Sequence, residues 1–344
     1  MKDIYPLYSK EFTCIAGACP DTCCAQWEIV IDEKYEKLYK SHPSQAAKDA
    51  VSAMYTDSDG DTCLRLKNGR CPMLNDENLC RLYIEMGKDA LCDVCRIYPR
   101  FNKKSEKINL CGISLSCPEA ARLILSDESF GELNNKPHFE SEEYNFLFKT
   151  FEAFRKLSIY GTLAYSLHFA ESIQDEIDFG DISKAEEVLE CAGVKLDAEN
   201  TTPDALMEIV RFMQTLDILR ESWKETLSML TLHLEKASND KEYGKKRELA
   251  LLEISSYKEI KNIGVYYLYK YLPEAMEYTD IYTCVITAVA CTEIICELCA
   301  MNKLQTGILE FANILEYAKD FSKEIEHNGD NMEKLLDVIC LAKS

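Results

Sequence analysis

Four cysteines lie within eleven residues near the start of the chain, in the run CIAGACPDTCC from Cys14 to Cys24. Seven more follow before residue 118, so eleven of the seventeen cysteines fall in the first third of this 344-residue chain. A thiolate is a soft, anionic ligand that suits zinc, copper(I) or an iron–sulfur cluster. This density predicts that thiolates bind a metal and that the N-terminal third folds around it.

The N-terminus and the apolar segments predict a cytoplasmic protein. The first twelve residues contain no apolar run of the kind that a signal peptide needs. The most apolar stretch, Ile281 to Ala300, is interrupted by Glu293 and Glu297, which indicates a buried helix and no membrane span. Because cytosolic thiols are kept reduced, a cysteine-rich segment there favours metal binding over disulfide bonds.

The net charge of −20 is concentrated in the second part of the chain. Residues 1–120 carry 16 basic and 18 acidic side chains, whereas residues 121–344 carry 23 and 41. Proteins that bind nucleic acids present a basic surface, so this distribution argues against a nucleic-acid partner. An acidic body would suit a basic partner, although acidic helical surfaces are common in proteins that have none.

The pattern of prolines and apolar residues divides the chain near residue 138. Seven of the nine prolines precede that point, and apolar residues then recur with the period of an α-helix. Helices are expected near residues 222–238, 245–271, 274–302, 304–326 and 329–342. The sequence therefore predicts a mainly α protein, in which an irregular cysteine-cluster domain with short strands (residues 1–137) precedes an acidic α-helical domain (residues 138–344).

Local signals within the N-terminal part predict several short elements. Residues 1–12 are expected to form an extended arm against the cysteine core, and Asp32 is a suitable N-cap for the helix that follows it. A tight reversal is expected between Cys71 and Cys80, bringing two distant thiols to one side. Pro118 is expected to open a helix, because proline is tolerated in the first turn.

The candidate metal ligands outnumber those that one site requires. Structural zinc and a 4Fe–4S cluster each take four thiolates, so the remaining cysteines serve in packing, as neighbours of the site or in a second site. The spacing CxxxCxxC, which is typical of radical S-adenosylmethionine enzymes, is absent, since Gln26 stands where Cys19 and Cys23 would require the third cysteine. We expect the metal ligands to come from Cys14, Cys19, Cys23, Cys24, Cys71, Cys80, Cys92 and Cys95. The cysteine pattern by itself is compatible with zinc and with an iron–sulfur cluster.

Other motifs are weaker or missing. Neither GxGxxG nor a Walker A loop occurs, and the five histidines are isolated, which favours structural roles for them. The cysteines between residues 284 and 299 fall mainly on one apolar helical face and are expected to pack as small hydrophobic residues. Arg96 and Arg100 flank the CxxC motif; they could offset thiolate charge or bind a carboxylate-bearing cofactor, or form ordinary salt bridges.

Four motifs together resemble the flagellin lysine N-methylase family. They are CPDTCCxxWxIxID at residues 19–32, CRLY at 80–83, CxxCRxYPR at 92–100 and SLSCPEAARLIL at 114–125. A looser version resembles the zinc- or iron-chelating cysteine-cluster proteins. The close match covers about the first 125 residues, whereas the helical remainder matches only in length and general character.

The resemblance implies a cytoplasmic enzyme that methylates lysine side chains of flagellin, with a 4Fe–4S cluster and S-adenosylmethionine as methyl donor. In the resemblance, Cys14, Cys92 and Cys117 stand beside the cysteines that match the family pattern better. The resemblance does not imply which four cysteines bind iron. It identifies no catalytic residue. The alternative is a metal-binding protein that acts as an electron carrier, a sensor or a zinc-containing adaptor and transfers no methyl group.

Overall fold

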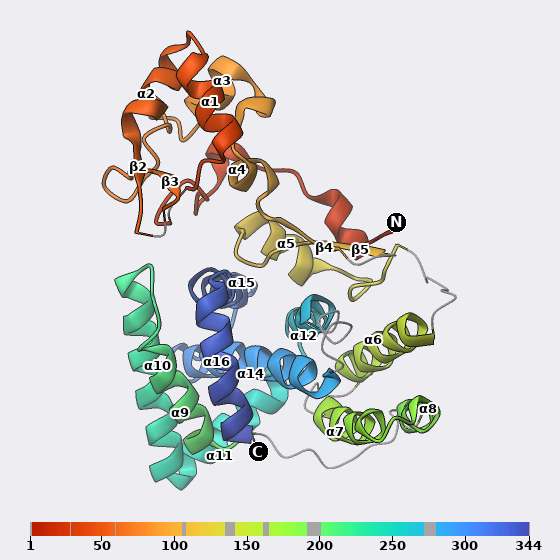
Figure 1. The fold of residues 1–344 in the computed structure, drawn as a ribbon. Helices are drawn as coiled ribbons and strands as arrows, with labels where there is room; N and C mark the ends of the chain where they lie inside the picture. Colours follow the sequence, from red (N-terminus) through yellow and green to blue (C-terminus); the bar gives the residue numbers. More distant parts are fainter. Residues whose placement is uncertain are drawn as a thin grey trace.

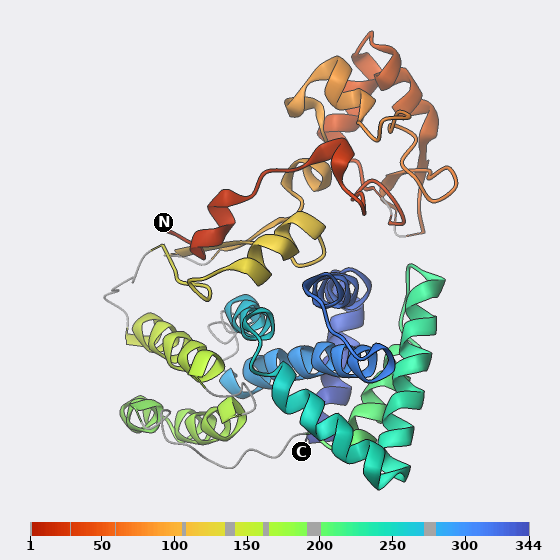
Figure 2. The ribbon, with the colours of Figure 1, turned by 180° about the vertical axis from the view of Figure 1, so that it is seen from behind.

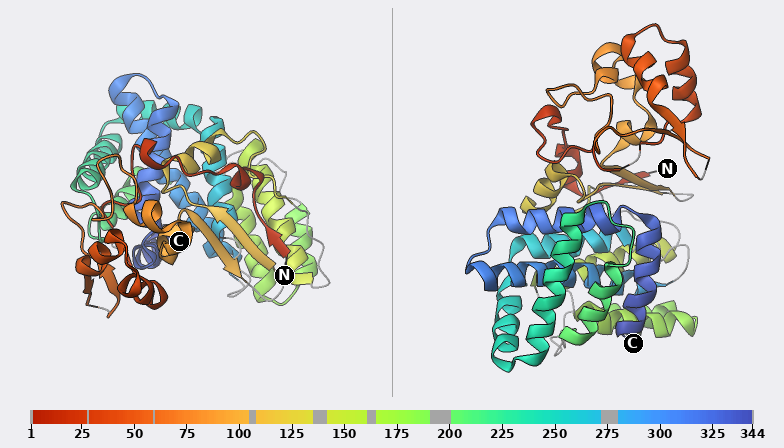
Figure 3. Two further views of the ribbon diagram at one scale, coloured as in Figure 1. Left: turned by 90° about the horizontal axis from the view of Figure 1, so that it is seen from above. Right: turned by 90° about the vertical axis from the view of Figure 1, so that its left-hand side faces the viewer.

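The computed structural model describes residues 2–27, 29–58, 60–104, 108–134, 142–160, 165–190, 201–271 and 280–343. Helices dominate and the strands lie in the N-terminal part, which confirms the predicted fold class. A small N-terminal lobe stands apart from a larger helical body, and β4 (Arg100–Lys104), β5 (Ile108–Ile113) and α5 (Pro118–Ser126) lie between them (Figure 1). The views from behind and from the side show the same two tiers (Figures 2 and 3).

The lobe contains α1 (Glu33–Ser41), α2 (Gln45–Ala53), α3 (Arg81–Met86), α4 (Asp93–Ile97) and the hairpin of β2 (Met54–Thr56) and β3 (Thr62–Leu64). Its core is separate from that of the body and consists of about a dozen buried residues between Ile29 and Cys92. The predicted reversal is present, with a β-bridge between Leu74 and Cys80. Asp32 precedes α1 as predicted, but its carboxylate accepts the backbone N–H of Asp93 (2.8 Å) and so joins α4 to α1.

The N-terminal arm packs differently from the prediction. Its strand β1 (Lys2–Ile4) pairs in parallel with β5, which pairs antiparallel with β4, so the sheet has the order β1-β5-β4. Ile4, Tyr8 and Phe12 are buried in the core of the helical body and not against the cysteines of the lobe. The reason is visible at Tyr269, whose hydroxyl donates to the carbonyl of Ile4 (2.8 Å). Body helices therefore hold the arm.

The predicted domain boundary between residues 137 and 138 lies outside the described residues. The buried core nevertheless shows how the chain is partitioned on either side of it. Residues of β5 and α5 share one continuous core with the helices that follow, whereas the separate small core is confined to the lobe. The segment from residue 108 to residue 133 thus connects the lobe to the body through packing as well as through the chain.

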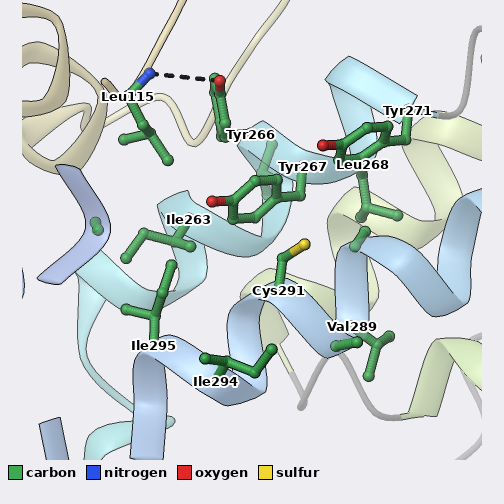
Figure 4. Close-up of a cluster of buried hydrophobic side chains, with 14 of the residues drawn as sticks. Leu115, Ile263, Tyr266, Tyr267, Leu268, Tyr271, Val289, Cys291, Ile294 and Ile295 are labelled. Carbon is green, nitrogen blue, oxygen red and sulfur yellow. Dashed lines mark hydrogen bonds between the residues drawn. The ribbon is translucent and has the colours of Figure 1, made fainter. Parts of the chain in front are cut away.

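The described helices of the body surround α14 (Ile281–Thr306). They are α6 (Glu142–Tyr160), α7 (Tyr165–Asp178), α8 (Ile182–Glu190), α9 (Pro203–Met213), α10 (Glu221–Asn239), α11 (Lys241–Ile254), α12 (Lys258–Tyr271), α15 (Phe311–Phe321) and α16 (Gly329–Lys343). By length and composition α14 could cross a membrane, but 89% of its most apolar window is buried inside the protein. Figure 4 shows Cys291 of α14 facing Tyr267 of α12 within this core.

Two features of the body depart from the predicted helices. The expected helix over 245–271 is interrupted after Ile254, because the side chains of Ser255 and Ser256 donate to the carbonyls of Leu252 and Glu253 and end α11. The expected helix over 304–326 begins only at Phe311 as α15, because α14 continues to Thr306 and ends at Gly307 with a φ of +83°; α15 then continues into a π-helical turn, η5 (Ser322–Glu326). Cys284, Cys291 and Cys299 are buried in α14 and Cys296 is half-buried, which confirms their predicted packing role.

Gly131 fixes the close approach of the segment after α5 to α12. Its φ of +70° belongs to the left-handed region, and an added Cβ would stand 2.6 Å from a methyl carbon of Val265. We expect Gly131→Ala to lower the free energy of unfolding by about 1–2 kcal/mol through backbone strain and by a further ~1–3 kcal/mol through overpacking. Urea unfolding, followed by circular dichroism, measures the change.

Gly180 provides a matched control for this substitution. It has a φ of +79°, but an added Cβ would meet nothing within 4 Å. Gly180→Ala should therefore lose only the backbone contribution, and Val265→Ala should recover part of the loss in the Gly131→Ala background. Equal losses for both single variants would show that contact with α12 is unimportant.

Candidate metal and active site

The N-terminal cysteines form two groups. The first, which we call the lobe cysteines, comprises Cys24, Cys71, Cys80, Cys92 and Cys95, all within or against the small core. Burial, and then the neighbouring thiols of Cys24, Cys80 and Cys92, raise the pKa of Cys71 to about 12. Cys92 and Cys95 share a side-chain hydrogen bond, which lowers the pKa of Cys92 and raises that of Cys95.

The second group, which we call the junction cysteines, comprises Cys14, Cys19, Cys23 and Cys117. It lies where the loop after the arm meets α5 and the end of α15. Burial, and then the nearby thiols of Cys19 and Cys14, raise the pKa of Cys117 to about 11. A hydrogen bond to Cys24, burial, and then the charges of Cys24, Cys14 and Cys117 raise the pKa of Cys23. Cys23 therefore connects the two groups, since it bonds to Cys24 of the lobe cysteines and lies near Cys14 and Cys117.

Backbone N–H groups point at sulfur atoms in both groups. The sulfur of Cys14 accepts from the N–H of Ala16 (3.4 Å). Burial raises the pKa of Cys117, Cys80 and Cys71, and nearby backbone N–H groups lower the pKa of each by a smaller amount. Such bonds stabilise the thiolate over the thiol. This recurring arrangement suits cysteines that bind a metal.

Two buried lysines approach the junction cysteines from α15 and η5. The ammonium of Lys323 donates to Asp21 (2.7 Å), and that of Lys319 lies 3.0 Å from the other carboxylate oxygen of Asp21. Their side chains are only 1% and 4% exposed. The charge of Lys319 lowers the pKa of Cys19 against the larger, opposite effect of burial. Positive charge of this kind stabilises an anionic thiolate centre.

Three aromatic rings cover the same junction. Trp27 lies 5.2 Å from Tyr98 and 4.6 Å from His327 between ring centroids, and its indole N–H donates to the carbonyl of Cys23 (2.6 Å). His327 is exposed as a whole, but desolvation of its ring on this side, together with Lys270 and Lys323, lowers its pKa. The imidazole is therefore neutral at pH 7. The rings join residues from the cysteine loop, the end of α4 and the end of η5.

The π-helical turn η5 carries a dense set of buried charges. Glu324 pairs with Arg220 at the start of α10, and Glu326 accepts from Tyr266 of α12 (2.8 Å) and pairs with Lys270. Charged side chains are almost never fully buried unless they are paired. This turn therefore places buried, paired charges beside the junction cysteines. π-helical turns occur frequently at functional sites.

The predicted ligand residues are thus divided, and one residue outside that prediction joins them. Cys14, Cys19 and Cys23 meet Cys117, which the motif analysis placed only beside the ligands. Two N-terminal cysteines lie elsewhere: the thiol of Cys63 donates to Asp57 (3.4 Å), and that of Cys111 donates to the carbonyl of Asn109. Within the described residues, no group of three or more His, Cys, Asp or Glu side chains is placed so that it could hold a metal ion.

Arg96 and Arg100 have protein partners. Arg96 pairs with Asp93 (2.6 Å) in the first turn of α4. Arg100 donates to the carbonyl of Phe12 (3.3 Å), and its guanidinium lies 4.8 Å from the centre of that ring. These contacts match the alternative of ordinary structural pairing, and binding of a carboxylate-bearing cofactor stays a prediction.

Little in the sequence indicated that residues of the helical body lie beside the junction cysteines. Lys319 and Lys323 are one helical turn apart, so they share a face, but burial of that face depends on Asp21, which is 302 positions from Lys323. His327 was interpreted as structural because no nucleophile or second histidine stands near it in sequence. Asp21, Trp27 and Tyr98 match the cysteine motifs of the family, but the motifs indicated no role for them.

The bond between Asp21 and the two lysines should hold the cysteine loop to the body. We expect Asp21→Ala to lower the free energy of unfolding by about 3 kcal/mol, because it leaves buried ammonium groups short of a counter-charge. Hydrogen exchange of residues 13–24 should accelerate together with this loss. Asp76→Ala, in an exposed position of the same lobe, is the control. Unchanged exchange in the Asp21 variant would show that other contacts hold the loop.

Comparison with known proteins gives consistent matches. Residues 153–341 match the model of the FliB lysine N-methylase C-terminal domain. The flagellar biosynthetic protein FliU of Salmonella muenchen is 28% identical over 160 residues, which are 45% of this chain and 94% of that protein. The lysine-N-methylases of Salmonella choleraesuis and Salmonella typhimurium are 30% and 29% identical over 137 residues. Those residues are 38% of this chain but span only 34% of each lysine-N-methylase. No solved structure matches the chain.

Proposed function

Because this chain belongs to the FliB lysine N-methylase family, we propose that it methylates lysine side chains of flagellin in the cytoplasm. The observation that carries the proposal is the family match, which covers residues 153–341 and so more than half of the chain. It lies in the helical part, whereas the motifs that first suggested the family lie in the first 125 residues. Both parts of the chain therefore lead to the same family independently.

We further propose that the junction cysteines bind a 4Fe–4S cluster and that S-adenosylmethionine donates the methyl group. Four thiolates are what such a cluster takes. The resemblance of the cysteine motifs to the family is what favours iron–sulfur over zinc in this proposal.

The cluster, when bound, would supply iron that could hold the amino and carboxylate groups of S-adenosylmethionine. The chain's own residues neutralise and shield it: Lys319 and Lys323 offset thiolate charge, and Asp21 fixes both ammonium groups. The aromatic surface of Trp27 and Tyr98 excludes water from the same region. Such surroundings suit the reaction, since a lysine side chain with an ordinary pKa near ~10.4 must lose its proton and its water before it attacks a methyl group.

The proposed partner and location agree with the charge and burial of the chain. We propose flagellin as the protein partner and neither nucleic acid nor a membrane, because the body is acidic and the long apolar helix α14 is the centre of its core. Modification of flagellin before its export places the protein in the cytoplasm.

Co-expression with flagellin, followed by intact-mass spectrometry, tests the function. The proposal predicts flagellin molecules heavier by whole methyl groups, with the added mass located on lysines after proteolysis. Anaerobic protein must carry iron and acid-labile sulfide for this test to be decisive. An unchanged flagellin mass with an intact cluster would contradict the methylase function and leave a sensor or electron carrier.

A further inference from the structure

We propose that the lysine side chain to be methylated binds between β4, α12 and η5, where the ammonium group of the chain's own Lys270 lies. We call this place, formed by Phe101, Tyr266, Tyr271 and Glu326, the Lys270 site. The proposal rests on the proposed methylase function and adds to it the position of the substrate lysine. Lys270 occupies the site when substrate is absent and leaves it when a lysine of flagellin enters.

Three aromatic rings lie near the ammonium group of Lys270. Its nitrogen is 5.6 Å from the ring centre of Phe101, 5.9 Å from that of Tyr266 and 6.0 Å from that of Tyr271. The two tyrosines come from α12 (Figure 4), and Phe101 comes from β4. The face of an aromatic ring attracts a cation at such distances, and aromatic cages also bind methylated lysine side chains. The site therefore suits a lysine both before and after methyl transfer.

Glu326 of η5 supplies the negative charge of the site. Its first carboxylate oxygen pairs with Lys270 and accepts the hydroxyl of Tyr266 (2.8 Å). Its second oxygen is buried and has no hydrogen-bond partner among the described residues. Glu297 and Glu324, buried glutamates that pair with arginines, use both of their oxygens. Because a buried polar atom without a partner is costly, the second oxygen of Glu326 is suited to an N–H of an incoming ammonium group.

Lys270 is placed so that another lysine can replace it. It stands in the last turn of α12, and its side chain is 16% exposed, whereas that of Glu326 is fully buried. Its ammonium group is carried on a flexible four-carbon chain. A lysine of flagellin presents the same group on a chain of the same length. The exchange therefore replaces one ion pair by another and leaves no buried carboxylate unpaired, which would be strongly destabilising.

The Lys270 site lies next to the aromatic rings that cover the junction cysteines. Glu326 is followed directly by His327, whose ring centre is 4.6 Å from that of Trp27 and 5.7 Å from that of Tyr98. These rings connect the Lys270 site to the junction, where we propose the cluster and the methyl donor. A lysine held by Glu326 is thus near the place from which the methyl group would come.

An ordinary structural ion pair is the alternative, and Lys303 provides an example of one. Lys303 pairs with Glu253 and lies 5.8 Å from the ring centre of Tyr257, so it has the same kinds of neighbour as Lys270. The side chain of Glu253 is 54% exposed, however, whereas that of Glu326 is fully buried. Lys303→Ala is therefore the matched control for Lys270→Ala.

Steady-state kinetics of flagellin methylation by the full-length protein tests the proposal. Lys270→Ala should lower KM for flagellin about tenfold and leave kcat unchanged, the effect expected if Lys270 fills about nine-tenths of the sites. Glu326→Gln should raise KM at least about tenfold, because a hydrogen bond to a charged group is lost. Lys303→Ala should change neither constant. An unchanged KM in both Lys270→Ala and Glu326→Gln would overturn the proposal.

A small amine tests the same site without any substitution. In n-butylamine an ammonium group ends a four-carbon chain, as in lysine, so it should compete with flagellin in the wild-type protein and raise KM at constant kcat. Inhibition that lowers kcat and leaves KM unchanged would contradict the proposal. This measurement decides the matter if Lys270→Ala fails to fold.

Failure of the methylase function is distinguishable from failure of this inference. If the wild-type protein leaves flagellin unmethylated, calorimetry with n-butylamine still tests the site. Lys270→Ala should bind the amine, and Lys270→Ala combined with Glu326→Gln should not. Absence of binding to Lys270→Ala, or equal binding to both variants, would overturn the proposed site.

Discussion

Cys117→Ser is expected to remove the junction centre and abolish methylation of flagellin while leaving the protein folded. Cys117 is the N-cap residue of α5, and its side chain makes no capping hydrogen bond there. Serine is among the preferred N-cap residues, so the substitution should preserve the start of the helix. The hydroxyl does not, however, replace a thiolate as a soft metal ligand. The substitution therefore separates the metal-binding role of this residue from its structural one.

Three measurements on Cys117→Ser give the expected pattern. Iron bound at the junction falls to background, flagellin gains no methyl groups, and the thermal unfolding of the helical body changes little. Cys111→Ser is the matched control, since its thiol bonds to Asn109 of the same strand and should affect neither metal nor methylation. Normal iron content in Cys117→Ser would show that this cysteine is not a ligand of the cluster.

Arg247→Met is expected to have the largest effect on stability in the body. Arg247 of α11 makes a two-pronged ion pair with Glu297 of α14, and both side chains are no more than 4% exposed. His233 of α10 lies 3.5 Å from the same carboxylate. Removing the guanidinium leaves a buried carboxylate uncompensated, which costs about 3–5 kcal/mol. Urea unfolding of the Arg247→Met variant measures this loss.

A double variant separates the cost of an unpaired charge from the value of the pair. Arg247→Met combined with Glu297→Met replaces both charges by apolar side chains, and such replacements are often neutral for stability. We expect the double variant to recover most of the loss. If it is no more stable than Arg247→Met alone, the pair contributes packing that methionine cannot supply, and unpaired charge is not the cause.

The sequence predicted the helices of the body well because their apolar periodicity is long and regular. It failed where side chains compete with the backbone, as at Ser255, and where a helix changes its pitch, as at η5. The buried run in α14 was interpreted correctly because Glu293 and Glu297 interrupt it. Glu297 then proved to be the partner of a buried arginine, which periodicity does not reveal.

Cysteine density and local motifs pointed to most thiols of the candidate site, and their role as metal ligands stays a prediction. One-dimensional spacing cannot show that Cys23 connects the junction cysteines to the lobe cysteines. It likewise could not show that Cys117 joins residues a hundred positions earlier, or that Lys319 and Lys323 reach the cysteine loop. Each of these depends on contacts between distant segments.

The location of the metal tests the account most directly. Anomalous diffraction at the iron absorption edge, from crystals of the full chain grown without oxygen, should show an iron peak enclosed by Cys14, Cys19, Cys23 and Cys117, beside Asp21 and its two lysines. An iron signal confined to the lobe, or junction sulfurs that point away from one another with no metal between them, would contradict it.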